Sequence, residues 1–513
     1  MSYYIGVDIG TTGTKSVVFN KQGTVIASSH YEYPLYSDTP VMAEQDPLEI
    51  FGAVISTLRN SMGKANLAAS DIQLVSFSAA MHSLIAVDAQ GNPLTRAITW
   101  ADQRAHPYAM ALRDTDQGQG IYQRTGTPIH PMSPLTKLLW LKAEQPALFA
   151  SAHKFIGIKA FVFHKLFGEY LVDHSLASAT GMFNLRERHW DQECLALTGI
   201  RAEQLPTPVP STHVLRHLNP HYAKDMGLSP DTPFVIGSSD GCLSNLGVGA
   251  IEPGVVAITI GTSAAIRTVT TEPVVDAQGR VFCYILDDKH YVVGGPINNG
   301  GIILRWVRDE LCSSVVQTAR RLDTDPYNLM SDIAAGVAPG SDGLMMLPFL
   351  AGERAPLWDA NARGSYVGLG LNHRKEHMIR AAFEGVLFNI KSVMNVIETI
   401  SGKPTKVQAT GGFARSAMWR QLMADILDKD IAVPASIESS CLGAVILGMY
   451  ALGEINDYSY VSDMVGATHA HTPTPENQIL YDQLFSLYSD VSESLRIHYE
   501  KIAAFQLTYS GKV

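Results

Sequence analysis

Asp240 is a carboxylate placed where it could act on a substrate hydroxyl. The apolar run 235–239 predicts a strand, and residues 243–246 indicate a helix directly after it. An aspartate at such a junction lies near the positive end of a helix and can accept a proton from a hydroxyl that attacks phosphorus. A simple N-cap aspartate would fit the same pattern. Asp240 is therefore a candidate general base.

A second candidate is the turn GTTGTK at residues 10–15, which follows an alternating apolar run that contains Asp8. Small residues let the backbone approach a phosphate, and Thr11, Thr12 and Lys15 add donors. Asp8 could hold a hydrated Mg2+ beside those phosphates. The spacing is not that of a Walker A loop, because a strand rather than a helix follows. An ordinary hairpin remains the alternative interpretation.

The same pattern returns about 250 residues later. Residues 260–263 read Ile-Gly-Thr-Ser between two β-rich runs, as residues 9–12 read Ile-Gly-Thr-Thr. The repeat favours two similar domains that each offer a Gly/Thr turn, with Gly261 and Thr262 in the second one. Coincidence also fits, since Gly-Thr turns are common.

Two further groups of residues stand at expected strand ends. Gly411 and Gly412 precede a helical pattern, together with Ser416, and would let a flat ring or sugar lie against the backbone. Met81, His82 and the run 100–104 (Trp-Ala-Asp-Gln-Arg) could bind a polyol. A plain strand–helix turn and a structural histidine are the alternatives.

The surrounding pattern predicts an α/β protein. Residues 5–32 indicate an antiparallel meander, and Asp46 with Glu49 predicts a capping box at the start of a helix. Strand and helix signals alternate to about residue 247, where we expect one domain (1–247) to end and a second (248–513) to begin. Near the end of the chain, Thr474-Pro475 predicts the start of a helix with an apolar seam at Leu480, Leu484, Tyr488, Val491, Leu495 and Ile502.

Composition excludes several classes of function. The 513 residues carry a formal net charge of −10, so an overall basic surface for nucleic acid or anionic lipid is absent. Five dispersed cysteines without zinc spacing, and a start that lacks the pattern of a signal peptide, are typical of a cytoplasmic protein with reduced thiols. The longest uncharged apolar run, 442–452, is too short to span a bilayer.

Taken together, these segments resemble the FGGY family of carbohydrate kinases over nearly the whole chain. TGTPIHPMSPLTKLLWLKAE from Thr125 is similar to the N-terminal signature around Lys137 and Trp140, with Ala143 as a small departure. Residues 364–384 resemble the C-terminal signature. LPFLAGERAPLWDANARG from Leu347 is also similar to the sugar kinases of this family.

The resemblance implies two ribonuclease-H-like domains of the actin/hexokinase ATPase type that flank a central cleft, and it implies ATP and Mg2+. Asp240 matches the family's general base, and the two Gly/Thr turns would hold the phosphates, with Asp8 near the metal. Gly301 and Arg305 match positions near the nucleotide, and Gly411, Gly412 and Ser416 would border the adenosine. Met81, His82 and Asp240 match positions that contact the sugar. A homodimer is compatible with the resemblance.

Within the family, ITWADQR from Ile98 and GGPINNGGIILRWVRDEL from Gly294 look most like the members that phosphorylate gluconate at its terminal hydroxyl. A sugar-acid substrate needs a cation or several N–H donors for its carboxylate, and His82, Arg104, His130 and Lys159 are the candidates. A xylulose kinase or another kinase of a neutral polyol is the second hypothesis. A non-enzymatic, actin-like nucleotide-binding protein is a third, since fold alone does not fix function.

Overall fold

The computed structural model describes residues 2–434 and 438–510, which form two compact units. Unit 1 comprises Met1–Glu252, Val269–Val293 and Glu438–Gly466, and unit 2 comprises Pro253–Thr268, Gly294–Ile437 and Ala467–Val513. These compact units differ from two domains with the single predicted boundary at 247/248, because two later segments of the chain belong to unit 1.

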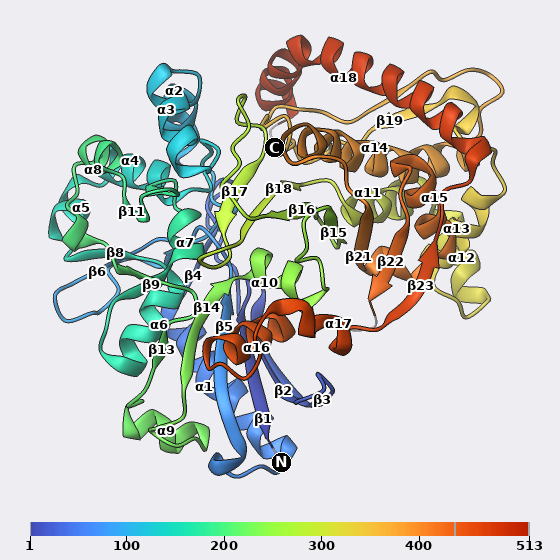
Figure 1. The fold of residues 1–513 in the computed structure, drawn as a ribbon. Helices are drawn as coiled ribbons and strands as arrows, with labels where there is room; N and C mark the ends of the chain where they lie inside the picture. The colour runs from blue at the N-terminus through green and yellow to red at the C-terminus, as the bar shows by residue number, and fades with distance from the viewer. Residues whose placement is uncertain (1, 435–437, 511–513) are drawn as a thin grey trace. The chain divides into compact units, whose positions relative to one another are not determined.

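Unit 1 is built on a six-stranded sheet with the order β13-β14-β5-β1-β2-β3. Strands β1 (Tyr3–Ile9), β2 (Gly13–Asn20) and β3 (Val25–Glu32) form the predicted antiparallel meander, which is confirmed. Strand β5 (Ile72–Ala79) pairs in parallel with β1, and β14 (Phe234–Ser239) pairs in parallel with β5. The carboxyl ends of β1, β5 and β14 therefore meet at one edge of the sheet (Figure 1).

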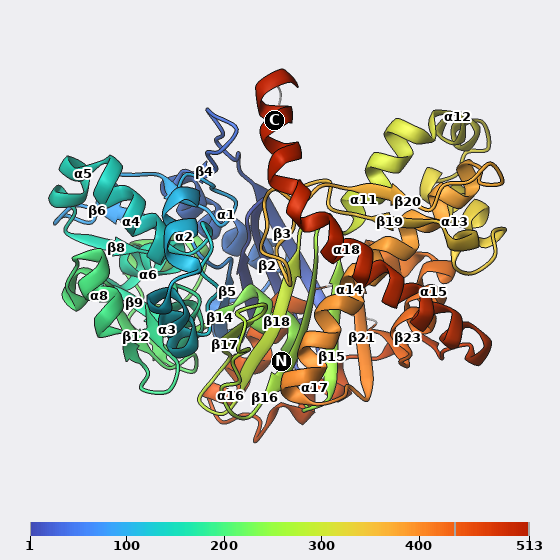
Figure 2. The ribbon, with the colours of Figure 1, turned by 90° about the horizontal axis from the view of Figure 1, so that it is seen from above.

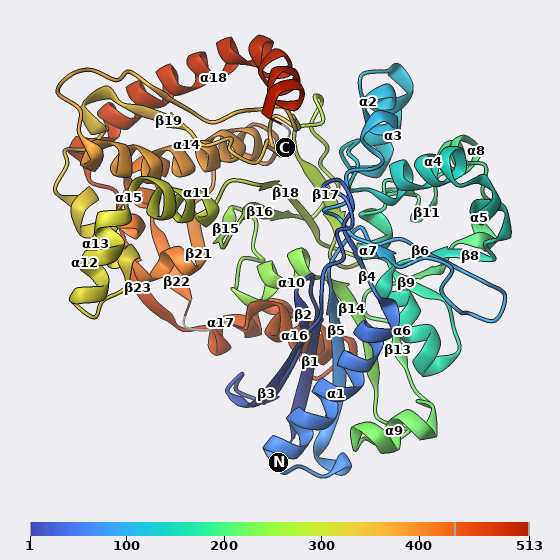
Figure 3. The same cartoon turned by 180° about the vertical axis from the view of Figure 1, so that it is seen from behind.

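Helices cover both faces of this sheet. Ile5, Val7 and Ile9 point to one face and pack with α1 (Pro47–Ala65), whereas Tyr4 points to the other face and packs with α16 (Ser439–Ala451). This alternation follows from the two-residue period of a strand. Figure 3 shows α1 lying along β1, β2 and β3 in the view from behind.

The start of α1 is capped by Asp46, whose carboxylate accepts hydrogen bonds from the N–H groups of Leu48 (2.8 Å) and Glu49 (3.4 Å). The N-cap prediction is confirmed, but the capping box is not formed. The Glu49 carboxylate instead accepts a hydrogen bond from the Tyr36 hydroxyl at 3.1 Å. A tertiary partner has therefore replaced the local one.

The remaining elements of unit 1 are short. They are β4 (Glu44–Gln45), β6 (Ile85–Val87), β7 (Ala97–Ile98), β8 (Lys154–Ile156), β9 (Leu171–Asp173), β10 (Phe183–Asn184), β11 (His189–Trp190), β12 (Thr207–Val209), β13 (Val214–Leu215), β17 (Phe282–Ile285), α2 (His106–Arg113), α3 (Asp116–Thr125), α4 (Pro134–Glu144), α5 (Pro146–Ser151), α6 (Ile158–Phe167), α7 (His174–Ser178), α8 (Gln192–Thr198), α9 (Pro220–Met226), α10 (Asp240–Gly247), α17 (Val461–Met464) and the 3₁₀ turns η1 (Ala69–Asp71), η2 (Ala202–Gln204) and η6 (Tyr458–Tyr460).

Unit 2 repeats the topology of unit 1. Strand β15 (Val255–Ile260) pairs antiparallel with β16 (Ala264–Thr270) and parallel with β21 (Lys406–Gly411), which pairs in parallel with β22 (Ile431–Pro434). The Gly261-Thr262 turn joins β15 to β16, as the turn at residues 10–12 joins β1 to β2. The two similar domains predicted from the repeat are therefore present.

Helices and short strands complete unit 2. They are the Gly294–Ile297 part of β18 (Tyr291–Ile297), β19 (Met345–Leu347), β20 (Ser365–Val367), β23 (Ala467–His471), α11 (Gly301–Trp306), α12 (Ser313–Arg321), α13 (Pro326–Ala335), α14 (Lys375–Ser401), α15 (Ala417–Leu427), α18 (Pro475–Ser510), the π-helical turn η3 (Val307–Leu311) and the 3₁₀ turns η4 (Ser341–Gly343) and η5 (Gly412–Arg415).

Helix α18 packs along α14 (Figure 2). Of its predicted seam, Leu484 and Tyr488 are buried, but Leu480 and Ile502 are 37% and 40% exposed. The buried stripe instead includes the two tyrosines at 481 and 499. Among the described residues, no helix is both long and apolar enough to cross a membrane.

Helix α16 reaches the sheet of unit 1 through glycines. A Cβ on Gly6 of β1 would lie 2.2 Å from the Cys441 carbonyl oxygen. Where α16 crosses α10, a Cβ on Gly443 would lie 2.0 Å from the Leu243 carbonyl oxygen, and a Cβ on Gly247 would lie 1.8 Å from that of Ser439. These contacts are with backbone atoms, so a side chain at any of the three glycines would force the packed elements apart.

We expect Gly443→Ala to lower the thermal midpoint of unfolding, because overpacking at a backbone contact costs about 1–3 kcal/mol. The matched control is Gly52→Ala in α1, where an added Cβ meets nothing within 4 Å. Alanine is the better helix former, so this control should be neutral or stabilising. Equal midpoints for the two variants would contradict the tight crossing of α10 and α16.

Candidate active site

Asp240 is the first residue of α10 and directly follows β14. The N-cap of this helix is Ser239, whose hydroxyl accepts a hydrogen bond from the Cys242 N–H. Asp240 is therefore not needed as a cap. Its half-buried carboxylate accepts a hydrogen bond from the Gly241 N–H at 2.7 Å. A helix start favours the ionised form of an acid, which is the form that a general base requires.

The strand end that carries Asp240 is held by the buried ammonium of Lys159. The register of β14 against β5 shifts between Val235 and Ser238, where Gly237 has a φ of 73°. Lys159 Nζ donates to the carbonyl oxygens of Ile236 and Ser238, both at 3.0 Å, and forms an ion pair with Asp173 at 2.6 Å. These contacts fix the backbone directly before Asp240.

This environment bears on our expectation for Lys159. Its side chain is only 2% exposed, and three protein oxygens already surround the ammonium. Burial lowers the pKa of Lys159, and the neighbouring Asp173 raises it. The geometry therefore argues against Lys159 as a ligand for a substrate carboxylate and favours a role in holding β14.

Asp8 lies at the same edge of the sheet. It is paired in register with Ser78 of β5, whose hydroxyl donates to its carboxylate at 2.7 Å. Burial raises the pKa of Asp8, whereas the Ser78 hydrogen bond and Lys15 on the facing strand lower it. Ser78 is in turn in register with Ser238 of β14. The sheet thus brings Asp8 and the segment that ends at Asp240 to one edge.

The turn at residues 10–13 is braced by aromatic side chains. The Tyr33 hydroxyl donates to the Gly10 carbonyl at 2.6 Å, and the Trp100 indole N–H donates to the Thr11 hydroxyl at 2.9 Å. Thr12 is exposed. Lys15 forms an ion pair with Glu438 at 3.0 Å, a partner that its place in the sequence did not reveal.

Met81 and His82 follow β5 and therefore lie at the edge shared with Asp8 and Asp240. His82 adopts a φ of 70°, and its Nδ1 lies 2.7 Å from the Ala179 carbonyl oxygen, to which it donates. Both residues are half-buried. His130 lies before α4 and accepts a hydrogen bond from the Met132 N–H through Nδ1.

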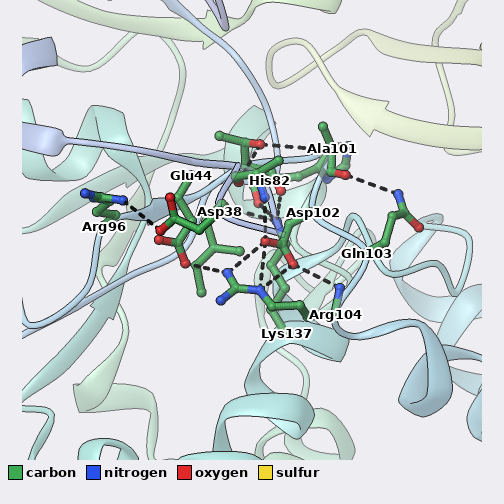
Figure 4. Close-up of polar contacts among 12 residues, drawn as sticks. Asp38, Glu44, His82, Arg96, Ala101, Asp102, Gln103, Arg104 and Lys137 are labelled. Carbon is green, nitrogen blue, oxygen red and sulfur yellow. Dashed lines mark hydrogen bonds and ion pairs between the residues drawn. The ribbon is translucent and has the colours of Figure 1, made fainter. Parts of the chain in front are cut away.

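Lys137 of α4 joins the His82 turn to a neighbouring segment (Figure 4). Its Nζ donates to the carbonyl oxygens of His82 (2.6 Å), Thr99 (2.7 Å) and Ile98 (3.2 Å). Three carbonyl oxygens match the three N–H donors of an ammonium group. The segment that leads into Trp100 is thereby tied to the turn that carries His82.

Arg104 is engaged in a second cluster shown in Figure 4. Its guanidinium pairs with Asp102 at 2.7 Å and with Glu44 at 2.5 Å, and it lies 4.4 Å from the centre of the Trp140 ring. Two carboxylates therefore already engage this one cation. That arrangement disfavours a substrate carboxylate at Arg104 and suits sugar hydroxyls better.

Unit 2 contains a separate pocket of about 340 Å³. It is lined by six of the residues predicted to lie near a nucleotide: Gly261, Thr262, Gly301, Arg305, Gly412 and Ser416. Gly411 instead faces β15, since a Cβ there would lie 2.1 Å from the Ile260 carbonyl oxygen. The sequence reasoning missed the aromatic part of the wall, which comprises Tyr327, Phe383, Phe413 and Trp419.

The aromatic wall and the glycine turn give the two parts of the pocket different chemistry. Trp419 packs edge-on against Phe383 and Phe413, and its indole nitrogen is buried without a hydrogen-bond partner. The Gly261 turn is held by the Gly301 N–H, which donates to the Gly261 carbonyl at 2.8 Å. A flat apolar ring and a phosphate could each find a suitable surface here.

Because Lys137 is buried, it predicts how the folding stability depends on pH. Burial lowers its pKa to about 7, whereas an unfolded lysine titrates near 10.4. Between these values the unfolded chain holds a proton that the folded chain lacks, so stability should rise with pH by about 1 kcal/mol per unit. The urea midpoint of the wild type should therefore rise relative to that of Lys137→Met as the pH rises from 7 to 9.5.

The control is Lys142→Met, because Lys142 is an exposed residue of the same helix. Its difference from the wild type should not change with pH. A difference between the wild type and Lys137→Met that stays constant from pH 6 to 9.5 would show that Lys137 keeps its proton when folded.

Comparison with known proteins places this chain among sugar kinases. Its sequence is 51% identical over 506 residues to a protein of Bacillus subtilis (strain 168) named Gluconokinase, and the match covers 98% of each chain. Two crystal structures from Lactobacillus acidophilus, each 39% identical with a TM-score of 0.93, match 98% of this chain. One is titled a gluconate kinase, and the match covers 99% of that chain. The other is titled a ligand-bound xylulose kinase, and the match covers 100% of that chain.

These matches confirm the predicted fold class, that of sugar kinases with two α/β domains of the actin/hexokinase type. Residues 3–247 match the N-terminal domain and residues 256–452 the C-terminal domain of one family. The chain belongs to the FGGY family of carbohydrate kinases, as its sequence motifs predicted.

Proposed function

We propose that this protein transfers the γ-phosphoryl group of ATP to the terminal hydroxyl of D-gluconate, which gives 6-phospho-D-gluconate. The observation that carries the proposal is the 51% identity to a Gluconokinase over nearly the full length of both chains. The arrangement of Asp8 and Asp240 at one edge of the unit 1 sheet supports it independently.

In this proposal the pocket of unit 2 binds ATP. The aromatic wall takes the adenine ring, and Gly412 and Ser416 border the adenosine, while Gly261, Thr262, Gly301 and Arg305 contact the phosphates. Thr11, Thr12 and Lys15 of unit 1 stay predicted phosphate contacts. Lys15 has to share its charge with Glu438, so we expect it to contribute less than a free cation would.

Asp240 acts as the general base. It orients the attacking hydroxyl and takes its proton, because an alcohol is a poor nucleophile at neutral pH. Lys159 keeps Asp240 in place by fixing the carbonyls of Ile236 and Ser238.

Asp8 fits a magnesium ion by the chemistry of its donor set. A single carboxylate oxygen, completed by water and phosphate oxygens, is a common way for proteins to hold Mg2+. When bound, Mg2+ neutralises negative charge on the triphosphate.

The sugar acid lies at the edge of unit 1 that carries Met81 and His82. Because Arg104 already faces two carboxylates, we assign hydroxyl groups of the sugar to its cluster. We therefore assign the carboxylate of gluconate to His82 or His130.

Xylulose is the second candidate substrate, since one of the two similar crystal structures is titled a xylulose kinase. We expect kcat/KM for gluconate to exceed that for xylulose, ribulose and glycerol by at least about tenfold, because only gluconate offers a carboxylate to the histidines. Sugar-dependent release of ADP measures this directly. A preference for xylulose would replace gluconate in the proposal, and ADP release independent of any sugar would contradict sugar phosphorylation altogether.

Asp240→Asn should lower kcat by about 10²–10⁴-fold, because the amide cannot accept the proton of the hydroxyl. ATP affinity measured by calorimetry should be unchanged. The control is Asp231→Asn, an aspartate of the same unit whose side chain is 81% exposed. Near-normal turnover of Asp240→Asn would remove Asp240 from the mechanism.

A further inference from the structure

Glu353 is a buried carboxylate of unit 2 that the proposed chemistry does not use. It belongs to the Ala351–Arg354 segment and is 2% exposed. Oε1 accepts hydrogen bonds from the N–H groups of Asn298 (2.6 Å) and Arg354 (2.8 Å). Oε2 accepts from the side-chain amides of Asn299 (2.8 Å) and Asn389 (2.6 Å). Four neutral donors thus converge on one carboxylate.

Further bonds fasten the Asn298-Asn299 pair to the same segment. The Asn299 amide donates to the Gly352 carbonyl at 2.7 Å, and its carbonyl accepts from the Ala351 N–H at 3.1 Å. The Asn298 amide donates to the Ala351 carbonyl at 3.0 Å. Glu353 is at the centre of this network, since it contacts both the backbone of Asn298 and the side chain of Asn299.

The two asparagines lead directly into the wall of the nucleotide pocket. Gly300 packs so tightly that a Cβ would lie 2.6 Å from the Ser263 carbonyl carbon. The Gly301 N–H donates to the Gly261 carbonyl at 2.8 Å, and the Ile302 N–H donates to the Thr262 carbonyl at 3.0 Å. The loop that Glu353 fastens therefore holds the glycine turn in place.

We infer that Glu353 is a positioning residue for nucleotide binding, which acts through residues 298–301 on the Gly261-Thr262 turn. The inference rests on the proposed assignment of ATP to this pocket. A carboxylate suits the role because it accepts several hydrogen bonds and donates none. Glutamine of the same size would turn one accepting oxygen into a donor that faces the N–H groups already there.

Asp425 provides a matched control. It is also a buried carboxylate of unit 2, and it accepts hydrogen bonds from the Thr474 N–H (2.8 Å) and from the side-chain amides of Gln421 (2.9 Å) and Asn477 (2.8 Å). Its partners connect α15 with the start of α18 and are not pocket residues. Asp425→Asn therefore tests the cost of the same chemical change away from the glycine turn.

The experiment compares ATP binding by calorimetry in the wild type, Glu353→Gln and Asp425→Asn, together with the KM values for ATP and gluconate. We expect Glu353→Gln to weaken ATP binding at least about tenfold and to raise the KM for ATP, with the KM for gluconate within about twofold. Asp425→Asn should lower thermal stability without changing ATP affinity by more than about twofold.

Asn298→Ala is the second variant, because Asn298 is half-buried and its loss leaves Glu353 intact. It should weaken ATP binding in the same direction by about threefold. If the wild type binds ATP and both Glu353→Gln and Asn298→Ala bind it equally well, the positioning role of Glu353 is wrong and the proposed function stands. If the wild type binds no ATP, the assignment of the pocket fails, and the inference fails with it.

Discussion

The parallel pairing of β1, β5 and β14 is the constraint on which the candidate site depends. Each strand ends at the same edge of the sheet, so Asp8, the Met81-His82 turn and Asp240 come together although they are far apart in the chain. A shift of one residue in any of these registers would turn Asp8 or Ser238 to the opposite face. Apolar packing of α1 and α16 on the two faces keeps the register, because a slipped strand would expose its apolar side chains.

Buried ionisable groups then fix the segments that leave the two sheets. Lys159 and Lys137 each donate to backbone carbonyls, and Glu353 accepts from backbone and amide N–H groups. Burying a charge is costly unless hydrogen bonds compensate, so such a group favours one loop conformation strongly over the alternatives. All three hold loops next to candidate binding residues, and a preorganised loop loses less conformational freedom when a ligand binds.

The sequence predicted the secondary structure and the repeat well, but it predicted the side-chain partners poorly. The meander, the Asp46 cap, the repeat and the position of Asp240 at a strand end depend on local patterns of a few residues, which sequence reasoning can detect. Lys159 and Arg104 were expected to bind a substrate carboxylate because they are cations in the right neighbourhood. Their carboxylate partners Asp173, Asp102 and Glu44 include groups distant in sequence, and no local pattern reveals such a pairing. The aromatic wall of the pocket was missed for the same reason.

The two units also differ at one equivalent position, and this difference fits the separate roles that we propose for them. In unit 1, Asp8 of the first strand is in register with Ser78 of the parallel neighbour and bonds to its hydroxyl. In unit 2, the corresponding pair is Thr259 and Thr410, whose hydroxyls lie 3.0 Å apart. The repeat thus keeps a polar pair two residues before each Gly/Thr turn, but only unit 1 places a carboxylate there. A carboxylate suits a cation, and this favours unit 1 over unit 2 for the proposed metal.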